Sequence, residues 1–118
     1  MPHDAVIDQT KTVEVNVACT SPHVIAYKFW MMKPGGQWTV VKTGQTGDDI
    51  PDFFPVGPAP KGTRLAYWLG VGGNANTVFQ AAVTLSQDGQ IVPGGFCAHT
   101  GTTNEHHVAE VQDEVDFV

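Results

Sequence analysis

The sequence predicts an all-β fold in which two antiparallel sheets pack face to face as a sandwich. Apolar and polar residues alternate along several short segments, which is the period of a strand with one buried face. The chain has 13 glycines and 8 prolines in 118 residues, so turn formers are dense between these segments. Roughly seven to eight strands are expected, and a chain of this length suits one domain, residues 1–118.

Two strands are predicted in the first part of the chain. Residues 12–20 alternate cleanly, and their apolar face consists of Val13, Val15, Val17 and Cys19. Residues 23–33 alternate in the same way, and their apolar face consists of Ile25, Tyr27, Phe29 and Met31. Residues 1–10 are expected to be flexible or to form an edge segment.

The most informative segment is a predicted hairpin, because it joins two aromatic-rich strands and so decides the fold class. Its turn is Pro34-Gly35-Gly36, which leads into a strand expected at residues 38–42. Beyond that strand, Gly44, Gly47 and the Asp48-Asp49 pair predict a loop.

Proline dominates the segment that follows. Four prolines between residues 51 and 61 remove backbone hydrogen-bond donors, which forbids a central strand. This segment is therefore expected to be an edge strand at best, or a connection wrapped around Phe53 and Phe54.

Two further strands are predicted at residues 63–72 and 77–87. Their apolar faces consist of Leu65, Tyr67, Leu69 and Val71 in the first and Phe79, Ala81, Val83 and Leu85 in the second. Asp88-Gly89 is a strong signal for a two-residue turn, and it predicts a second hairpin that continues into residues 90–92.

The last part of the chain is predicted to be a loop and then a strand. Residues 93–106 are expected to form a long loop. Residues 107–118 place Val111, Val115 and Phe117 on one side and four acidic or amide side chains on the other. A helix is the alternative for this segment, but its valine and phenylalanine content favours a strand.

Charge limits the classes of partner. Twelve acidic against six basic residues give a net charge of −6, which repels phosphate backbones and anionic lipid surfaces. Neither nucleic acid nor a membrane is therefore expected as a partner. The first residues show no leader, and no run approaches the roughly 20 apolar residues of a membrane span. The expected location is soluble and, by default, cytoplasmic.

The two cysteines, Cys19 and Cys97, lie near opposite ends of the domain. A disulfide between them is one alternative, and its large loop would stabilise the fold by roughly 3–4 kcal/mol. Without a leader, reduced thiols are the default expectation.

A family resemblance covers a little over half of the chain. It is carried by Thr-Val-Glu-Val-Asn-Val from Thr12, Tyr27-x-Phe29-Trp30, Pro34-Gly35-Gly36, Trp38-Thr-Val-Val and Gly62-Thr-Arg-Leu-x-Tyr-x-Leu-x-Val. With these features, residues 12–73 resemble the bacterial immunoglobulin-like β-sandwich modules related to the triple-tyrosine (Y_Y_Y-type) domains. The resemblance implies an immunoglobulin- or fibronectin-like sandwich that serves as an appended interaction or structural module without chemistry of its own.

The chain also departs from that family pattern. Residues 43–49 and the proline-rich connection replace the short turn that is usual after the Trp38 strand. Residues beyond Gly73 exceed what one such module needs. These departures indicate a free-standing domain.

An aromatic surface is the main functional hypothesis. By strand parity, Trp30 shares a face with Lys28, and Trp68 shares a face with Arg64, so both rings are expected on an outer sheet surface. The binding residues predicted there are Trp30, Trp68, Lys28, Arg64 and Trp38. Exposed paired aromatics bind sugars, peptides or partner subunits, and arginine can pack over such a ring.

This surface predicts a non-enzymatic binding module whose partner is another protein, a second copy of the chain or a carbohydrate. The competing interpretation is that a bulge reverses the parity or that a loop covers the rings.

A metal site is the alternative function. Cys97, His99, His106 and His107 are soft or borderline ligands within eleven residues, and zinc or copper accepts such groups. Their spacing matches no standard motif, and adjacent His106 and His107 point to opposite faces of an extended chain. The default is no cofactor. A nucleophilic site at Cys97 is not expected, because a reactive thiolate needs an electropositive setting and this end of the chain is acidic.

Overall fold

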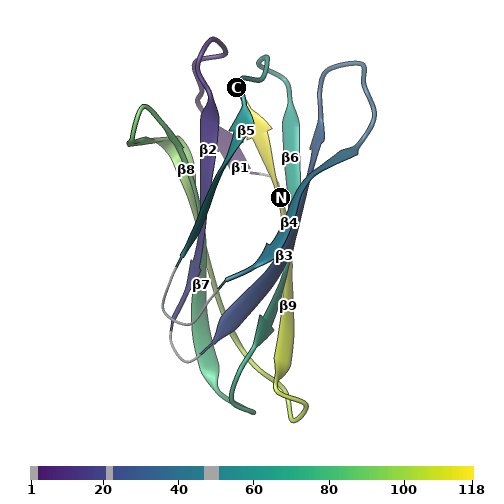
Figure 1. The fold of residues 1–118 in the computed structure, drawn as a ribbon, viewed down its shortest axis with the longest axis vertical. Helices are drawn as coiled ribbons and strands as arrows, with labels where there is room; N and C mark the ends of the chain where they lie inside the picture. The colour runs from purple at the N-terminus through teal and green to yellow at the C-terminus, as the bar shows by residue number, and fades with distance from the viewer. Residues whose placement is uncertain (1–2, 21–22, 47–50) are drawn as a thin grey trace.

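The computed structural model describes residues 3–20, 23–46 and 51–118, and within these ranges it contains nine strands and no helix. The strands are β1 (His3–Ala5), β2 (Val13–Cys19), β3 (Val24–Met32), β4 (Thr39–Gln45), β5 (Asp52–Gly57), β6 (Arg64–Gly72), β7 (Val78–Gln87), β8 (Gln90–Thr102) and β9 (Val108–Phe117). Figure 1 shows them arranged as two layers that face each other. The all-β sandwich is confirmed, with nine strands in place of the expected seven to eight.

The two layers differ in strand number. One sheet has five strands in the order β1-β9-β6-β3-β4, and the other has four in the order β5-β2-β7-β8. Neighbouring strands pair antiparallel except β1 and β9, which are parallel. The hairpins β3–β4 and β7–β8 each stay within one sheet, whereas the other connections cross between the layers (Figure 1). As a result β3 and β6, which are far apart in sequence, lie side by side.

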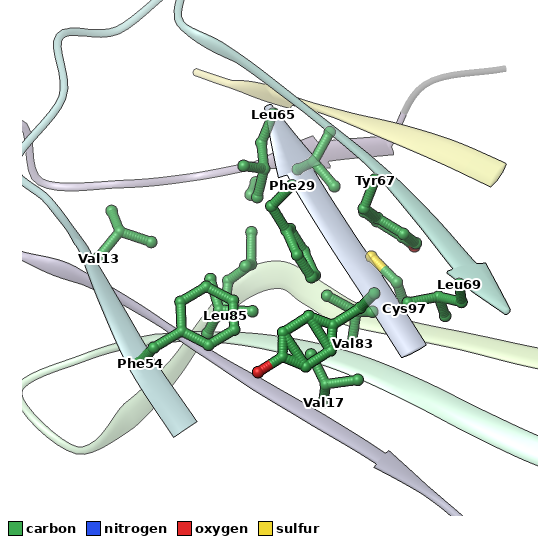
Figure 2. Close-up of a cluster of buried hydrophobic side chains, with 14 of the residues drawn as sticks. Val13, Val17, Phe29, Phe54, Leu65, Tyr67, Leu69, Val83, Leu85 and Cys97 are labelled. Carbon is green, nitrogen blue, oxygen red and sulfur yellow. The ribbon is translucent and has the colours of Figure 1, made fainter. Parts of the chain in front are cut away.

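Side chains from both sheets form one hydrophobic core between the layers (Figure 2). The predicted inward faces are confirmed: their residues are buried, apart from Cys19 and Val111, which are partly buried. The ring centroid of Phe29 lies 5.3 Å from those of Phe54 and Tyr67. Phe54 therefore anchors the edge strand β5 in the aromatic centre of the core.

Both predicted hairpin turns are present. In the first, Gly36 N–H donates to Lys33 C=O at 2.8 Å and Gly35 has φ +73°, which is the geometry of a type II turn after Pro34. In the second, Asp88 and Gly89 have φ values of +53° and +76°, so they form a type I′ turn between paired Gln87 and Gln90.

The segment around the predicted loop at Gly44 needs a correction. β4 continues through Gly44 to Gln45. The sequence predicts a loop after residue 42 instead. The glycine is required there by close packing, because a Cβ atom at this position would collide with the Tyr27 ring. Gly47 and the Asp48-Asp49 pair lie outside the described residues.

The proline-rich segment forms an edge strand. β5 pairs only with β2 among the described strands, and Pro55 lies within it. Its side chains alternate, because Phe53 is exposed and Phe54 is buried. The expectation of an edge strand is confirmed.

The prediction of a long loop at residues 93–106 was wrong. β8 runs for 13 residues, from Gln90 to Thr102, and pairs with β7. The register between β7 and β8 shifts after Thr84, which faces Phe96, because Ser86 faces Ile91. Pro93 lies within this irregular part of β8, where its missing backbone donor does not interrupt regular pairing. Long-range pairing thus overrides the local turn signals.

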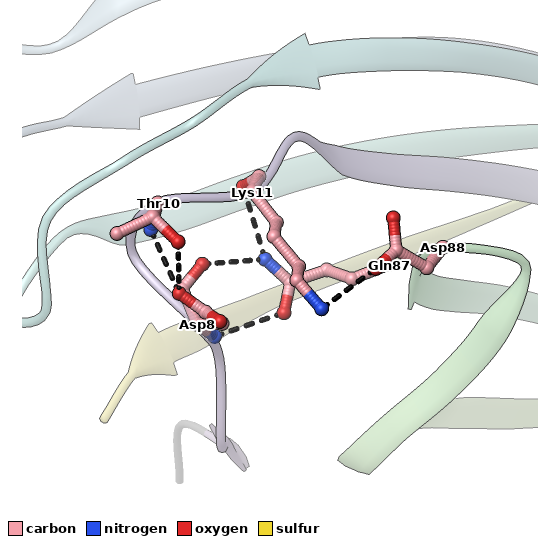
Figure 3. Close-up of polar contacts among 5 residues, drawn as sticks. All are labelled: Asp8, Thr10, Lys11, Gln87 and Asp88. Atoms are coloured by element: carbon pink, nitrogen blue, oxygen red, sulfur yellow. Dashed lines mark hydrogen bonds and ion pairs between the residues drawn. The ribbon is translucent and has the colours of Figure 1, made fainter.

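The N-terminal segment is attached to the sandwich from His3 onward. β1 forms an edge of the five-stranded sheet, and the Asp8 side chain accepts hydrogen bonds from Thr10 (Figure 3). The Gln87 amide binds the backbone of Asp8 and Lys11, and Lys11 Nζ lies 2.7 Å from Asp88 Oδ2. These contacts fasten residues 8–11 to the β7–β8 hairpin.

No disulfide joins Cys19 to Cys97. Cys19 faces Ala81 on one side of β7, whereas Cys97 faces Val83 on the other side. Two strand spacings and an offset of two residues along the strands therefore separate them by roughly 12 Å, which exceeds the reach of a disulfide. Cys19 Sγ donates instead to His23 C=O at 3.0 Å.

Candidate functional site

The outer face of the five-stranded sheet carries the predicted aromatic residues. Tyr27, Phe29 and Leu69 are buried, so the alternating Lys28, Trp30 and Trp68 face away from the core, and both indoles are half-buried. The register confirms that the two tryptophans are neighbours. Trp30 of β3 faces Ala66 of β6, and Lys28 faces Trp68, so the indoles occupy diagonal positions on adjacent strands.

The two tryptophans border a hollow of about 410 Å³. Ala66 forms part of its floor, because a methyl group there leaves space between the larger side chains. Gln112 and Glu114 of β9 line the opposite wall. We call this hollow, defined by Trp30, Ala66, Trp68, Gln112 and Glu114, the aromatic groove.

Small residues extend the depression past Trp68. A second hollow of about 360 Å³ is lined by Trp68, Gly70, Gly72 and Glu110, so Trp68 lies between the two. A Cβ atom at Gly70 would lie 2.5 Å from the Trp68 ring, which shows that the indole leans along β6 over this glycine. The ring therefore lies low on the sheet surface, and its exposed part is accessible to a ligand in either hollow.

Charged side chains surround the groove unevenly. Lys28 Nζ lies 5.1 Å from the Trp30 ring centroid, which is a cation–π contact. Arg64 Nε donates to Asp116 Oδ1 at 2.9 Å. Lys28, not Arg64, is thus the cation packed over a tryptophan here. The β9 side is acidic, as the sequence predicted, because Glu110, Glu114 and Asp116 alternate outward.

Trp38 lies apart from this arrangement. It precedes β4 in the connection that follows the Pro34 turn, and 41% of its surface is exposed. It is not among the residues that line the aromatic groove. Four of the five predicted binding residues, Lys28, Trp30, Arg64 and Trp68, share one face of the sheet.

Several residues that line the two hollows were not predicted as binding residues from the sequence. Ala66, Gly70 and Gly72 alternate with the inward residues of β6, and Gln112 and Glu114 come from the last strand. A signal for them was present, because small residues at positions 66, 70 and 72 surround Trp68 with spacing of two. Their meaning depends on β9 lying beside β6, which the local sequence does not specify.

The predicted metal ligands fall into two separate places. Cys97 and His99 lie on β8, where Cys97 is buried in the core beside Tyr67 (Figure 2). His106 and His107 lie in the turn before β9. Asp113, near His99, is six residues from His107, which corresponds to about 20 Å along a strand. Over residues 3–20, 23–46 and 51–118, no cluster of three or more His, Cys, Asp or Glu residues could hold a metal.

His99 instead belongs to a polar cluster between the two sheets. His99 Nε2 lies 2.6 Å from the Tyr67 hydroxyl and 3.8 Å from Asp113 Oδ2. His3 Nε2 lies 2.6 Å from the same Asp113 oxygen. Burial raises the pKa of Tyr67, and burial also lowers the pKa of His99 against the opposing effect of Asp113. Near neutral pH Tyr67 is therefore a neutral phenol hydrogen-bonded to a neutral imidazole.

Cys97 completes this cluster without becoming a nucleophile. Burial raises the pKa of its thiol, so the thiol is protonated near neutral pH. The cluster joins β1, β6, β8 and β9 by polar contacts, and its geometry serves to hold the sheets together.

Comparison of the chain with protein-family models, curated proteins and solved structures finds no match. Among the described residues there is also no helix with the length and apolar character needed to cross a membrane. Function is therefore inferred from the geometry of the surface.

Proposed function

We propose that this protein is a carbohydrate-binding module that holds a neutral sugar chain in the aromatic groove. The proposal rests on one observation: Trp30 and Trp68 lie on the same outer face and border a hollow of about 410 Å³. This volume falls within the range of about 300–1,000 Å³ that is usual for small-ligand sites.

The chemistry of the lining favours a sugar. One side of a pyranose ring presents C–H groups, which pack on an indole, while its hydroxyl groups need polar partners around the rim. Gln112 offers an amide and Glu114 a carboxylate beside the two rings. Trp68 leans along the sheet, so a ring placed on it remains within reach of these groups.

Charge selects among sugars. The β9 wall carries Glu110, Glu114 and Asp116, and Arg64 forms ion pairs with both Asp116 and Glu114. Three carboxylates against one arginine leave this wall negatively charged, so it would repel an anionic sugar. A neutral oligosaccharide avoids this cost and accepts or donates hydrogen bonds through its hydroxyl groups.

The resemblance of residues 12–73 to appended β-sandwich modules agrees with this proposal. Such modules bind without performing a reaction, and the aromatic groove contains binding groups without an activated nucleophile. We therefore propose binding, with no catalytic step, as the activity of this surface.

Isothermal titration calorimetry against a panel of neutral oligosaccharides tests the proposal. We expect Trp30→Ala and Trp68→Ala to weaken binding roughly fivefold or more, because loss of a stacked ring costs about 1–3 kcal/mol. Trp38→Ala is the matched control, since Trp38 is exposed but lies outside the groove. Its affinity should stay within about twofold of the parent value.

Two results would overturn the proposal. One is the absence of binding to every neutral oligosaccharide at millimolar concentration. The other is an equal loss of affinity in all three tryptophan variants, because that result would separate binding from the groove.

A further inference from the structure

The outer face of the four-stranded sheet lacks charge over most of its area. Eleven described residues, on β2, β7 and β8 and at Thr20 just after β2, lie on this side between the Asn16 row and the start of β7, and none is an acid, lysine or arginine. They are Asn16, Ala18, Thr20, Val78, Gln80, Ala82, Thr84, Phe96, Ala98, Thr100 and Thr102. Glu14 lies beyond them, in the next row toward the β7–β8 turn.

Two exposed phenylalanines project from this face. Phe53 of β5 faces Asn16, and Phe96 of β8 faces Thr84, so one row of the sheet has a ring near each edge. Their exposed fractions are 59% and 60%. Side chains of this kind are costly to leave in water, and together they mark an interaction surface.

The next row along the strands is low because it consists of alanines. Ala18, Ala82 and Ala98 face one another across β2, β7 and β8. A hollow of about 410 Å³ lies over this row, and Phe96 forms one of its walls. The face therefore carries both a projecting ring and a depression next to it.

We propose that this face is a homodimer interface, in which a second copy of the chain packs sheet against sheet. A projection beside a depression on one surface is self-complementary under a two-fold rotation. With the axis between Phe96 and the alanine row, each Phe96 enters the partner's hollow. Facing sheets pack with interdigitating side chains in the same way inside sandwiches.

Charge also selects this face for contact between identical chains. Each copy carries a net charge of −6, so most juxtapositions of two copies bring like charges together. The outer face of the five-stranded sheet presents Glu110, Glu114 and Asp116, whereas the alanine row and its neighbours present none. The uncharged face allows close contact without desolvating a carboxylate.

The edge strands β4 and β5 have features that hinder edge-to-edge pairing between two copies. β5 contains Pro55, which lacks a backbone donor. β4 has a register irregularity opposite Phe29 and Trp30, and its Lys42 turns inward over the Phe54 ring, with 5.7 Å from Nζ to the centroid. These features protect the β4 and β5 edges from pairing with a strand of another copy.

The arrangement places the two aromatic grooves on opposite outer sides of the dimer. The interface itself does not depend on what the grooves bind.

Sedimentation equilibrium of the full chain over a wide concentration range tests the dimer. The monomer mass is 12.7 kDa, so the expected dimer mass is twice that, about 25 kDa. Phe96→Ser should raise the dimer dissociation constant at least tenfold, and Ala98→Glu should raise it further by placing like charges in the interface. Trp68→Ala, on the opposite sheet, should leave it within twofold.

Circular dichroism and thermal melting show whether each variant folds. Phe96→Ser decides the question if Ala98→Glu does not fold, because 60% of the Phe96 surface is exposed in the monomer and its loss leaves the core intact. A parent chain that stays monomeric at all concentrations overturns the proposal and assigns the face to a different partner. A folded Phe96→Ser variant with unchanged dimerisation, or a Trp68→Ala variant that dissociates, also overturns it.

Discussion

The two outer sheet faces of this protein follow the same alternation but have different chemistry. The five-stranded sheet presents Trp30 and Trp68 over a depression floored by small residues and surrounded by charges. The four-stranded sheet presents Phe53 and Phe96 beside a row of alanines without charges. A tryptophan among polar groups suits a hydroxyl-rich ligand, whereas phenylalanine beside alanine suits a second apolar surface.

This difference shows that the outward-facing residues of a strand decide which partner a sheet face can bind. Inward residues must fill the core, so they are similar in both sheets. Outward residues are under no packing requirement of that kind, and their identity sets which partner each face can bind. Substitutions of inward-facing and outward-facing residues should therefore have separate effects on packing and on binding.

The largest expected difference in stability is between substitutions at two neighbouring residues of β5, Phe54 and Phe53. Phe54→Ala should lower the free energy of unfolding by about 3–5 kcal/mol, because its ring is buried against Phe29 and Tyr27. Phe53→Ala should change it by less than about 0.5 kcal/mol, since 59% of that side chain is exposed. Urea unfolding in dilute solution measures both. Equal losses would mean that the parity of β5 is misassigned.

A smaller difference in stability is expected between substitutions of two strand glycines that lie against aromatic rings. Gly101→Ala should cost about 1–3 kcal/mol, because the new Cβ atom would lie 2.8 Å from the buried Phe79 ring. Gly70→Ala should cost less than about 0.5 kcal/mol, because Trp68 can swing outward into solvent. Urea unfolding gives the cost, and calorimetry should show weaker oligosaccharide binding only in Gly70→Ala. A greater loss of stability in Gly70→Ala would contradict this assignment.

A third prediction concerns pH and the inward side of β8. The pKa of His99 is lowered from 6.5 by burial, so the unfolded chain binds a proton there more readily than the native state. The stabilising effect of neutral His99 is complete above pH 6.5 and is lost as the pH falls below it.

Thermal melting between pH 7.5 and pH 5.5 checks this prediction. The midpoint should fall less steeply in His99→Gln than in the parent chain, because the variant lacks this ionisable group. Parallel pH profiles would contradict the assigned role of His99.

The smallest effect is expected on the charged outer face. Arg64→Met removes the ion pair with Asp116. The side chains of both residues are partly exposed, so the free energy of unfolding should fall by less than about 1 kcal/mol. The difference should shrink further in high salt, because ions screen the pair. Urea unfolding at two salt concentrations measures it, with Thr84→Ala on the uncharged face as a salt-insensitive control. A loss above about 2 kcal/mol would contradict the assignment of Arg64 to a weak surface ion pair.

Most of the fold could be predicted because strand alternation and turn chemistry are local. The inward residues of β3 and β6 and both hairpin turns follow directly from spacing and from glycine and proline positions. The continuation of β8 beyond residues 90–92 could not be predicted, because Pro93 and its neighbouring glycines signal a turn locally. Its pairing with β7 and an accommodating register shift outweigh that signal.

The candidate site was predicted only in part. Parity placed Trp30 and Trp68 outward, and the hypothesis that they are neighbours needed β3 and β6 to be adjacent. Gln112 and Glu114 could not be assigned to the groove, because strand order in a sheet depends on contacts between distant segments. Cys97 and His106, though close in sequence, are also separated, because Cys97 lies buried within β8 and His106 lies in the turn between β8 and β9.

By itself the sequence determined the class of fold, the turns and the inward face of nearly every strand, because these follow from the period of two and from local backbone preferences. The tertiary structure alone decided that Trp30 and Trp68 share a groove with Gln112 and that Phe96 lies beside a row of alanines. Those arrangements come from the pairing of strands distant in sequence, and local spacing carries no information about which strands pair.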